Sequence, residues 1–209
     1  HKMLRSGMTL AVAGGNTMGE VARGMQSAAA MDVMVVPARG GVGPAVETQA
    51  NAVAAEIARR LGGRHQVIHL PDNLDAAALQ EMSRLPEVRE ALEVLRRTDL
   101  IIHGVGRADE MAQKRRLPPE TMEKLKSKRA VGEAFGDFFD FEGRNVLQMS
   151  TVSAGLQHKD CRLVAVAAGE KKAEAIIAAA RHEKHDSLIT DEAAAKKIVS
   201  LLQGADSAR

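Results

Sequence analysis

Met8-Thr9-Leu10-Ala11-Val12-Ala13-Gly14-Gly15-Asn16-Thr17 is the stretch that decides the fold, because a short apolar run of strand-forming residues stops here at a glycine-bearing turn. The same arrangement recurs at Ala38-Arg39-Gly40-Gly41-Val42-Gly43, His103-Gly104-Val105-Gly106 and Ala167-Ala168-Gly169-Glu170-Lys171-Lys172. In a parallel α/β sheet the carboxyl ends of the strands share one edge, so four such turns predict one ligand-binding crevice. Helix N-termini at that edge offer N–H groups to an anion.

Strand-like and helical segments alternate along the chain, which favours a parallel sheet with helices on both faces. The sequence predicts strands at residues 9–13, 33–36, 66–70, 100–103, 162–167 and 187–190. It predicts helices from residue 16 or 17, at 46–61, 75–83, 86–97, 171–181 and 191–202, and a short one from Pro118-Pro119. Residues 131–149 form a small antiparallel excursion. We therefore expect one Rossmann-like α/β domain over residues 1–209.

Composition excludes several classes of protein. A net charge of +2 is too small to indicate a nucleic-acid-binding domain, and without Trp or Tyr the chain lacks stacking platforms for single strands. The single cysteine, Cys161, suits a reducing cytoplasm, and no apolar run approaches the roughly 20 residues of a membrane span. We expect a cytoplasmic protein.

The turns carry residue types that suit a phosphate. Gly14 and Gly15 permit close backbone approach, and Asn16 or Thr17 opens a helix, with Glu20 placed as the capping-box partner of Thr17. Arg39 follows a strand, where its guanidinium could hold a phosphate through two hydrogen bonds. The alternatives are an ordinary connection for the glycine turn and a surface ion pair for Arg39.

Gln49 and two basic runs share this ambiguity between ligand contact and solvated surface. Gln49 could point back into the crevice or be a solvated helix residue. The run Lys114-Arg115-Arg116 is basic, and Lys171 and Lys172 begin a helix, where cations oppose the dipole unless an anion is bound. Exposure to water explains both basic runs equally well.

Two acid–base residues lie in apolar surroundings. Glu133 precedes Ala134-Phe135-Gly136 and suits a carboxylate that accepts bonds from sugar hydroxyls, with a structural ion pair as the alternative. His103 ends a strand, where a hydrogen-bonded core residue is the ordinary interpretation. The chain lacks the nucleotide-binding, dinucleotide-binding, nucleophile-elbow and H-E-x-x-H motifs, so we expect no cofactor and no metal. His182-Glu183-Lys184-His185 is interpreted as a solvated helix end.

The order of seven motifs resembles the effector-binding domain of SorC-family repressors from about residue 9 to residue 202. These motifs are Gly14-Gly15-Asn16-Thr17, Pro37-Ala38-Arg39-Gly40-Gly41, Gln49-Ala50-Asn51, His103-Gly104-Val105-Gly106, Met111-Ala112-Gln113-Lys114-Arg115, Glu133-Ala134-Phe135-Gly136 and Lys172-Ala173-Glu174-Ala175-Ile176. The resemblance implies a fold related to ribose-5-phosphate isomerase and glucosamine-6-phosphate deaminase. It also implies that an N-terminal helix-turn-helix, absent from this chain, contacts operator DNA.

The resemblance further implies a sugar-phosphate sensor that is a homodimer or tetramer, with fructose 1,6-bisphosphate as effector and no membrane partner. The contacts it implies are Thr17, Arg39, Gln49, Lys114 or Arg115, Glu133 and the helix start at Lys172. With the turn glycines and their neighbours, the predicted ligand-binding set is Gly14, Gly15, Asn16, Thr17, Arg39, Gln49, Gly104, Lys114, Arg115, Glu133, Gly169, Lys171 and Lys172.

Two departures from the family's pattern bear on the ligand. Asn16 stands where a second Thr is expected, and Lys114 stands where an Arg is expected, although Arg115 follows directly. Lysine lacks the guanidinium fork, so phosphate affinity or selectivity could differ. Two alternatives stay open: a sugar-phosphate isomerase or deaminase with Glu133 and His103 as base and acid, and a SorC-type sensor of another phosphosugar.

Overall fold

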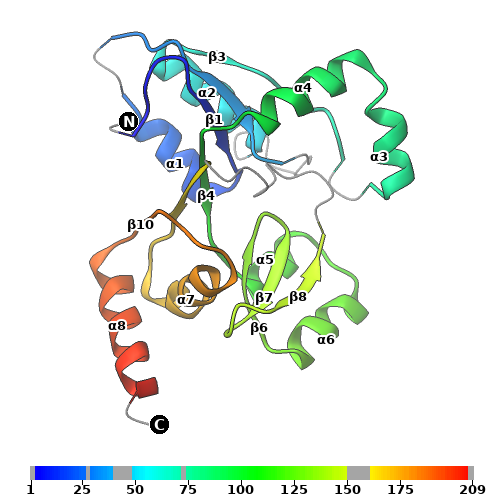
Figure 1. Cartoon of the computed structure of the whole chain (residues 1–209). Helices are drawn as coiled ribbons and strands as arrows, with labels where there is room; N and C mark the ends of the chain where they lie inside the picture. Colours follow the sequence, from blue (N-terminus) through cyan, green and yellow to red (C-terminus); the bar gives the residue numbers. More distant parts are fainter. Residues whose placement is uncertain (1–2, 27–28, 40–48, 72–73, 150–160, 207–209) are drawn as a thin grey trace. The chain divides into compact units, whose positions relative to one another are not determined.

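A computed structural model of the chain describes residues 3–26, 29–39, 49–71, 74–149 and 161–206 (Figure 1). The chain divides into two compact units. The first unit comprises His1–Gly104 with Met149–Val164, and the second comprises Val105–Gln148 with Ala165–Arg209. Two sheets run through them: a six-stranded sheet of order β10-β9-β4-β1-β2-β3 and a four-stranded sheet of order β5-β6-β7-β8.

The first unit alternates strands and helices as the sequence predicts. Its elements are β1 (Thr9–Val12), α1 (Asn16–Gly24), β2 (Met34–Pro37), α2 (Ala50–Leu61), β3 (Arg64–His65), α3 (Ala76–Met82), α4 (Pro86–Arg96) and β4 (Leu100–Gly104). β1 pairs in parallel with both β2 and β4, and β2 pairs in parallel with β3. The predicted parallel α/β sheet is confirmed.

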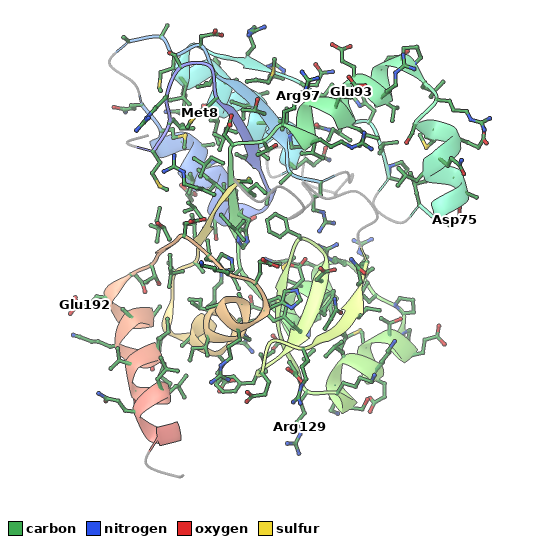
Figure 2. The ribbon with its side chains drawn as sticks, viewed as in Figure 1. Met8, Asp75, Glu93, Arg97, Arg129 and Glu192 are labelled. Atoms are coloured by element: carbon green, nitrogen blue, oxygen red, sulfur yellow. The ribbon has the colours of Figure 1, made fainter. Side chains whose placement is uncertain are left out.

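Continuous apolar runs explain these buried strands. Leu10, Ala11 and Val12 of β1 are wholly buried, which is the pattern of a parallel strand covered on both faces. α2 buries one face at helical spacing and ends at Gly62 in the left-handed conformation. α3 begins where the Asp75 carboxylate accepts the Ala78 N–H at 2.7 Å (Figure 2).

The strand predicted at residues 66–70 is wrong in position, because pairing stops at the two-residue β3. Beyond it the Asn51 side chain takes the place of a neighbouring strand: its Nδ2 donates to the Ile68 carbonyl and its Oδ1 accepts the Ile68 N–H, both at 3.0 Å. Ile68 and Leu70 are nevertheless buried. The alternation of apolar residues therefore correctly predicted which residues are buried. It did not predict that the Asn51 amide, in place of a neighbouring strand, would bond the backbone of Ile68.

The second unit contains the antiparallel strands that were predicted for residues 131–149, and this prediction is also confirmed. Its elements are β5 (Gly106–Arg107), α5 (Ala108–Lys114), α6 (Pro119–Ser127), β6 (Ala130–Ala134), β7 (Asp137–Asp140), β8 (Asn145–Gln148), the 3-10 turn η2 (Glu170–Lys172), α7 (Ala173–His182), β10 (Ser187–Ile189) and α8 (Glu192–Asp206). β9 (Arg162–Val166) contributes residues to both units.

Close packing on Phe139 shapes the core of the second unit. Phe139 is wholly buried, and a Cβ added to Gly132 would lie 2.3 Å from its ring. The alanine-rich α7 contributes Ala175, Ile176, Ala178 and Ala179 to the same buried cluster. Glycine and alanine let the helix and strands approach closely, which suits a core with so few large side chains.

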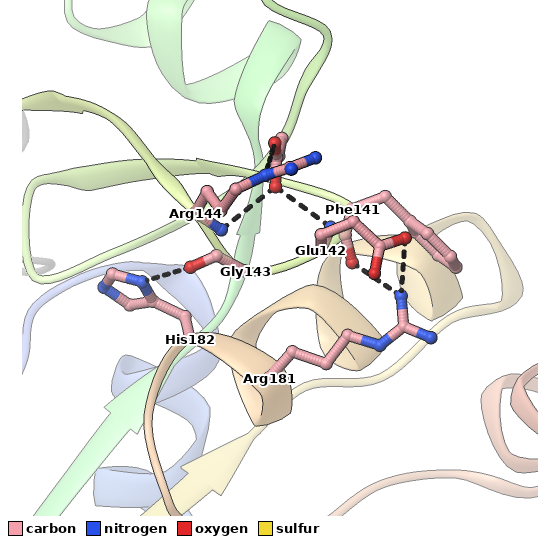
Figure 3. A network of polar contacts seen from close by, with 7 residues as sticks. Phe141, Glu142, Gly143, Arg144, Arg181 and His182 are labelled. Carbon is pink, nitrogen blue, oxygen red and sulfur yellow. Dashed lines mark hydrogen bonds and ion pairs between the residues drawn. The ribbon is translucent and has the colours of Figure 1, made fainter.

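A polar network joins the β7–β8 connection to the end of α7 (Figure 3). Asp140 Oδ1 accepts the N–H groups of Glu142 and Arg144, both at 3.0 Å. Arg181 donates to the Phe141 carbonyl at 2.9 Å, and its guanidinium lies 4.5 Å from the Phe141 ring centroid. These contacts fix the connection on the last turn of α7.

His182 completes this network, so the prediction of a solvated helix end is wrong for this residue. Its Nδ1 lies 2.8 Å from the Gly143 carbonyl, and its ring stacks on Phe139 with centroids 4.8 Å apart. Its Nε2 lies 3.9 Å from Asp137 Oδ2, an ion-pair distance. The Asp137 carboxylate is the largest cause of a raised pKa for His182, with help from the Gly143 carbonyl and Glu183, while burial opposes it.

This geometry predicts a pH dependence of stability. Because the folded pKa of His182 lies above the unfolded value of about 6.5, its contribution is complete below that pH and is lost as the pH rises through the folded pKa. We expect the difference in free energy of unfolding between the wild type and His182→Gln, from urea titrations, to shrink as the pH rises. Asp137→Asn should abolish this trend, and a difference independent of pH would contradict it.

Candidate functional site

The first unit brings three predicted turns to one edge of its sheet. β2 and β4 flank β1 in parallel, so the carboxyl ends of all three strands lie together. Ala38 N–H donates to the Val12 carbonyl at 2.7 Å, and Ala13 N–H donates to the Ile102 carbonyl at 3.0 Å. Gly14, Arg39 and Gly104 follow or end these strands, so the structure places them at neighbouring strand ends.

The helix α1 begins at a glycine turn without a side-chain cap. Gly15 is the N-cap residue, with φ 111° and ψ 163°, and no side chain caps the helix. The predicted capping box of Thr17 and Glu20 is therefore wrong, and Glu20 is paired with Arg23 instead. The first N–H groups of a helix have no partner within it, so Asn16 and Thr17 present donors at the positive end of the helix dipole.

Arg39 and Gln49 lie on either side of residues outside the described part of the chain. Arg39 is half-buried just after β2, and Gln49 is the N-cap residue of α2. The predicted turn Gly40-Gly41-Val42-Gly43 and the first residues of the helix predicted from residue 46 lie outside the described residues. The ligand role of Arg39 and Gln49 stays a prediction.

In the second unit an ion pair joins two predicted site residues. Arg115 Nη2 donates to Glu133 Oε1 at 2.7 Å, and the Gly136 N–H donates to the same oxygen at 2.7 Å. The Glu133 side chain is 6% exposed and that of Arg115 is 19% exposed. The basic run at the end of α5 is thus divided, because Arg115 is turned inward while Lys114 and Arg116 are exposed.

The turn at Gly169, in the second unit, has a backbone conformation similar to that of the turn at Gly15. Gly169 is the N-cap residue of η2 with φ 102°, and its N–H donates to Asp191 Oδ2 at 3.0 Å. The helix predicted from Lys171 begins as a 3-10 turn and becomes α-helical at Ala173. Lys171 and Lys172 therefore lie in that short turn.

Lys172 is half-buried at the end of η2, and this burial is the main cause of a lowered pKa. The charge of Glu110 opposes the shift, and the charge of Lys114 adds to it. The predicted site residues Lys114, Arg115, Glu133, Lys171 and Lys172 all belong to the second unit.

The sequence analysis missed Glu110, whose charge opposes the lowered pKa of Lys172. It lies in the first turn of α5, a seven-residue helix that was not predicted. Arg107 followed by Asp109 and Glu110 gave a usable indication, because acidic residues favour the first turn of a helix.

The described residues offer no obvious metal site. Within those ranges, no three His, Cys, Asp or Glu side chains form a group that could hold a metal ion. His103 is buried, with Nδ1 3.1 Å from the Gly104 carbonyl, so its interpretation as a hydrogen-bonded core residue is confirmed. No helix in the described part of the chain is long and apolar enough to cross a membrane.

The chain is similar to sugar-binding domains and to bacterial transcriptional regulators. Residues 1–200 match the family described as "Putative sugar-binding domain". The chain is 40% identical over 197 residues to the central glycolytic genes regulator of Priestia megaterium, covering 91% of the chain and 57% of that regulator. The regulator of the same name from Bacillus subtilis is 36% identical over 193 residues, with the same coverage.

The chain is also similar to solved structures of SorC-family regulators. A SorC family transcriptional regulator from Enterococcus faecalis superposes with a TM-score of 0.83 at 38% identity, over 95% of this chain and 83% of that one. Full-length SorC, the sorbitol operon regulator of Klebsiella pneumoniae, has a TM-score of 0.80 at 18% identity over 94% of this chain and 67% of that one, which shows a shared fold. The chain belongs to the sugar-binding domain family, and within it to the domains of SorC-family regulators.

These comparisons also bear on catalysis. The relatives and structural neighbours named here are transcriptional regulators, so the expectation of a binding domain in place of an enzyme is confirmed. The chain spans 57% of the length of the two regulators from Priestia and Bacillus.

The glycine before α1 allows a direct test of the turn. The conformation of Gly15 is one that only glycine adopts readily, yet a Cβ there would meet no atom within 4 Å. We expect Gly15→Ala to lower the free energy of unfolding by about 1–3 kcal/mol through backbone strain alone. Gly24→Ala, in α1 with open space and an ordinary φ, is the matched control and should be neutral or slightly stabilising, because alanine favours a helix more than glycine does. Equal urea midpoints for both variants would contradict the assigned turn conformation.

Proposed function

We propose that the chain is the effector-binding domain of a bacterial transcriptional repressor of glycolytic genes, and that its effector is a phosphorylated sugar. The observation that carries this proposal is the uncapped N-terminus of α1, which presents N–H donors at the sheet edge where Gly14, Arg39 and Gly104 lie. In the second unit the half-buried Lys172 supports a further phosphate contact, because burial lowers its pKa and a bound anion would favour its charged form.

Fructose 1,6-bisphosphate is the effector that we propose first. The two relatives named above are regulators of central glycolytic genes, and fructose 1,6-bisphosphate is a phosphorylated sugar of glycolysis. We propose contacts from Gly14, Gly15, Asn16, Thr17, Arg39, Gln49 and Gly104 in the first unit. The proposed contacts of the second unit are Lys114, Arg115, Glu133, Gly169, Lys171 and Lys172.

The regulatory step that we propose is a change of assembly. Effector binding shifts a dimer–tetramer balance of the full-length regulator in the cytoplasm and thereby changes its affinity for operator DNA, which an N-terminal domain contacts. Such a shift requires that the effector bind one assembly state more tightly than the other.

Calorimetry with the 209-residue chain tests the effector. We expect fructose 1,6-bisphosphate to bind more tightly than fructose 6-phosphate or glucose 6-phosphate. Arg39→Ala and Lys172→Met should each weaken binding about 10- to 100-fold, because a hydrogen bond to a charged group contributes roughly 1.5–3 kcal/mol.

Matched controls keep this test specific. Arg64→Ala and Lys196→Met remove exposed cations paired with Asp32 and Glu192, and they should leave the affinity unchanged. Preference for a monophosphate would reassign the effector, and absence of any binding would refute the phosphosugar site. Product formation from a phosphosugar would show an isomerase or deaminase.

A further inference from the structure

The strand β10 forms one edge of the six-stranded sheet, with β9 as its neighbour on one side only. The Ile189 carbonyl accepts the Ala167 N–H at 3.0 Å, so the backbone groups of Ile189 face the end of β9. Successive residues of a strand direct their N–H and C=O groups to opposite sides, so those of Leu188 point away from the sheet. An edge with outward backbone groups is a template for another strand.

The side chains of β10 do not protect this edge. Natural edge strands commonly carry charged or polar residues, as β3 does at the opposite edge with Arg64 and His65. In β10, by contrast, Leu188 is 43% exposed and Ile189 is 56% exposed. Of the six large apolar side chains that are exposed in the described part of the chain, four lie between residues 188 and 202. Such a concentration is typical of a contact surface.

The charges that flank β10 are complementary to those of a second copy of the same strand. Lys184 lies four residues before Leu188, and Glu192 lies four residues after it; both are exposed. An antiparallel copy with Leu188 opposite Leu188 therefore places each Lys184 on the side of the other copy's Glu192. Glu192 also pairs with Lys196 of its own helix, at 2.6 Å. A parallel copy would place like charges together.

The backbone selects the same register as the charges. In an antiparallel pair, two residues directly opposite each other exchange either both N–H···O bonds or none. Because the N–H and C=O groups of Leu188 point outward, Leu188 opposite Leu188 is a hydrogen-bonded pair with a two-fold axis between its members. The two leucine side chains then lie on the same face of the sheet, where opposite side chains contact each other.

Contacts within the second unit fix this edge without a partner. β10 leads directly into α8 (Figure 1), and Asp191 stands between them. Asp191 Oδ1 accepts the Ala194 N–H at 2.8 Å, which caps α8, and its Oδ2 accepts the Gly169 N–H at 3.0 Å. A surface that is already ordered loses little conformational freedom when it associates.

We propose that β10 is a self-association surface, through which two copies of this chain pair antiparallel about a two-fold axis at Leu188 and continue one sheet. The partner is a second copy because the outward backbone groups, the apolar side chains and the flanking charges are all self-complementary. The inference rests on the proposed function only in that the regulator assembles with itself, and its test needs no effector.

Sedimentation equilibrium of the 209-residue chain without effector tests the surface. Leu188→Lys places two like charges opposite each other at the axis, so we expect the dimer dissociation constant to rise about 10-fold or more. Met122→Lys, which makes the same kind of change at an exposed position of α6, is the matched control and should leave it unchanged. A monomeric wild type, or a dimer that Leu188→Lys leaves intact, overturns the proposal.

Charge reversal tests the register. Lys184→Glu should weaken the dimer about threefold or more, because two-fold symmetry affects two ion pairs at once. Addition of Glu192→Lys restores opposite charges across the axis and should restore the association. Lys128→Glu, at an exposed position after α6, is the control and should have no effect. A double variant that associates no better than Lys184→Glu overturns the antiparallel register.

Amide hydrogen exchange tests the strand pairing itself, even if Leu188→Lys folds poorly. In the wild type the Leu188 N–H should exchange more slowly as the protein concentration rises, whereas the Ile189 N–H, which faces β9, should change less. Exchange at Leu188 that is independent of concentration refutes the pairing of β10. If the chain binds a phosphosugar but lacks this pairing, the inference fails and the proposed function stands. A β10 dimer that binds no phosphosugar gives the reverse result.

Discussion

The parallel pairing of β1 with β2 on one side and with β4 on the other is the constraint on which the first unit depends. It aligns the carboxyl ends of three strands, so the turns at Gly14, Arg39 and Gly104 lie at one edge of the sheet. The strands can pair in this way because Leu10, Ala11 and Val12 are apolar on both faces. Burial of the strands therefore positions the polar residues that follow them.

The sequence was a sound guide wherever a long periodic pattern met a clear boundary. α2 ends at the predicted Gly62 region, and α4 begins at Pro86 as expected. The pattern was a poor guide where side chains replaced backbone contacts. Asn51 supplies the hydrogen-bond partners of the Ile68 backbone, so the apolar alternation at residues 66–70 does not form a paired strand. The seven-residue helix α5 has too few turns to show a helical period in the sequence.

The sequence could single out the candidate residues by type and position. It could not predict which of them pair with one another, such as Arg115 with Glu133. Position after a strand was enough to single out Arg39, and a glycine turn was enough to single out Lys172. Spacing could not divide Lys114 from Arg115, because the choice depends on which side chain reaches a buried carboxylate eighteen residues away. That choice assigns Arg115 to Glu133 and leaves Lys114 exposed.

Gly15 and Gly169 give the two units turns of similar backbone conformation. Each precedes a helical turn, has a φ above 100° and has open space where a side chain would lie. Neither turn receives a side-chain cap at its N-terminus. Glycine lets the chain turn sharply out of a buried strand, and an uncapped helical turn leaves N–H donors available. Thr17 follows the first turn with a hydroxyl, and Lys171 and Lys172 follow the second with positive charge, so each glycine turn is followed by hydrogen-bond donors.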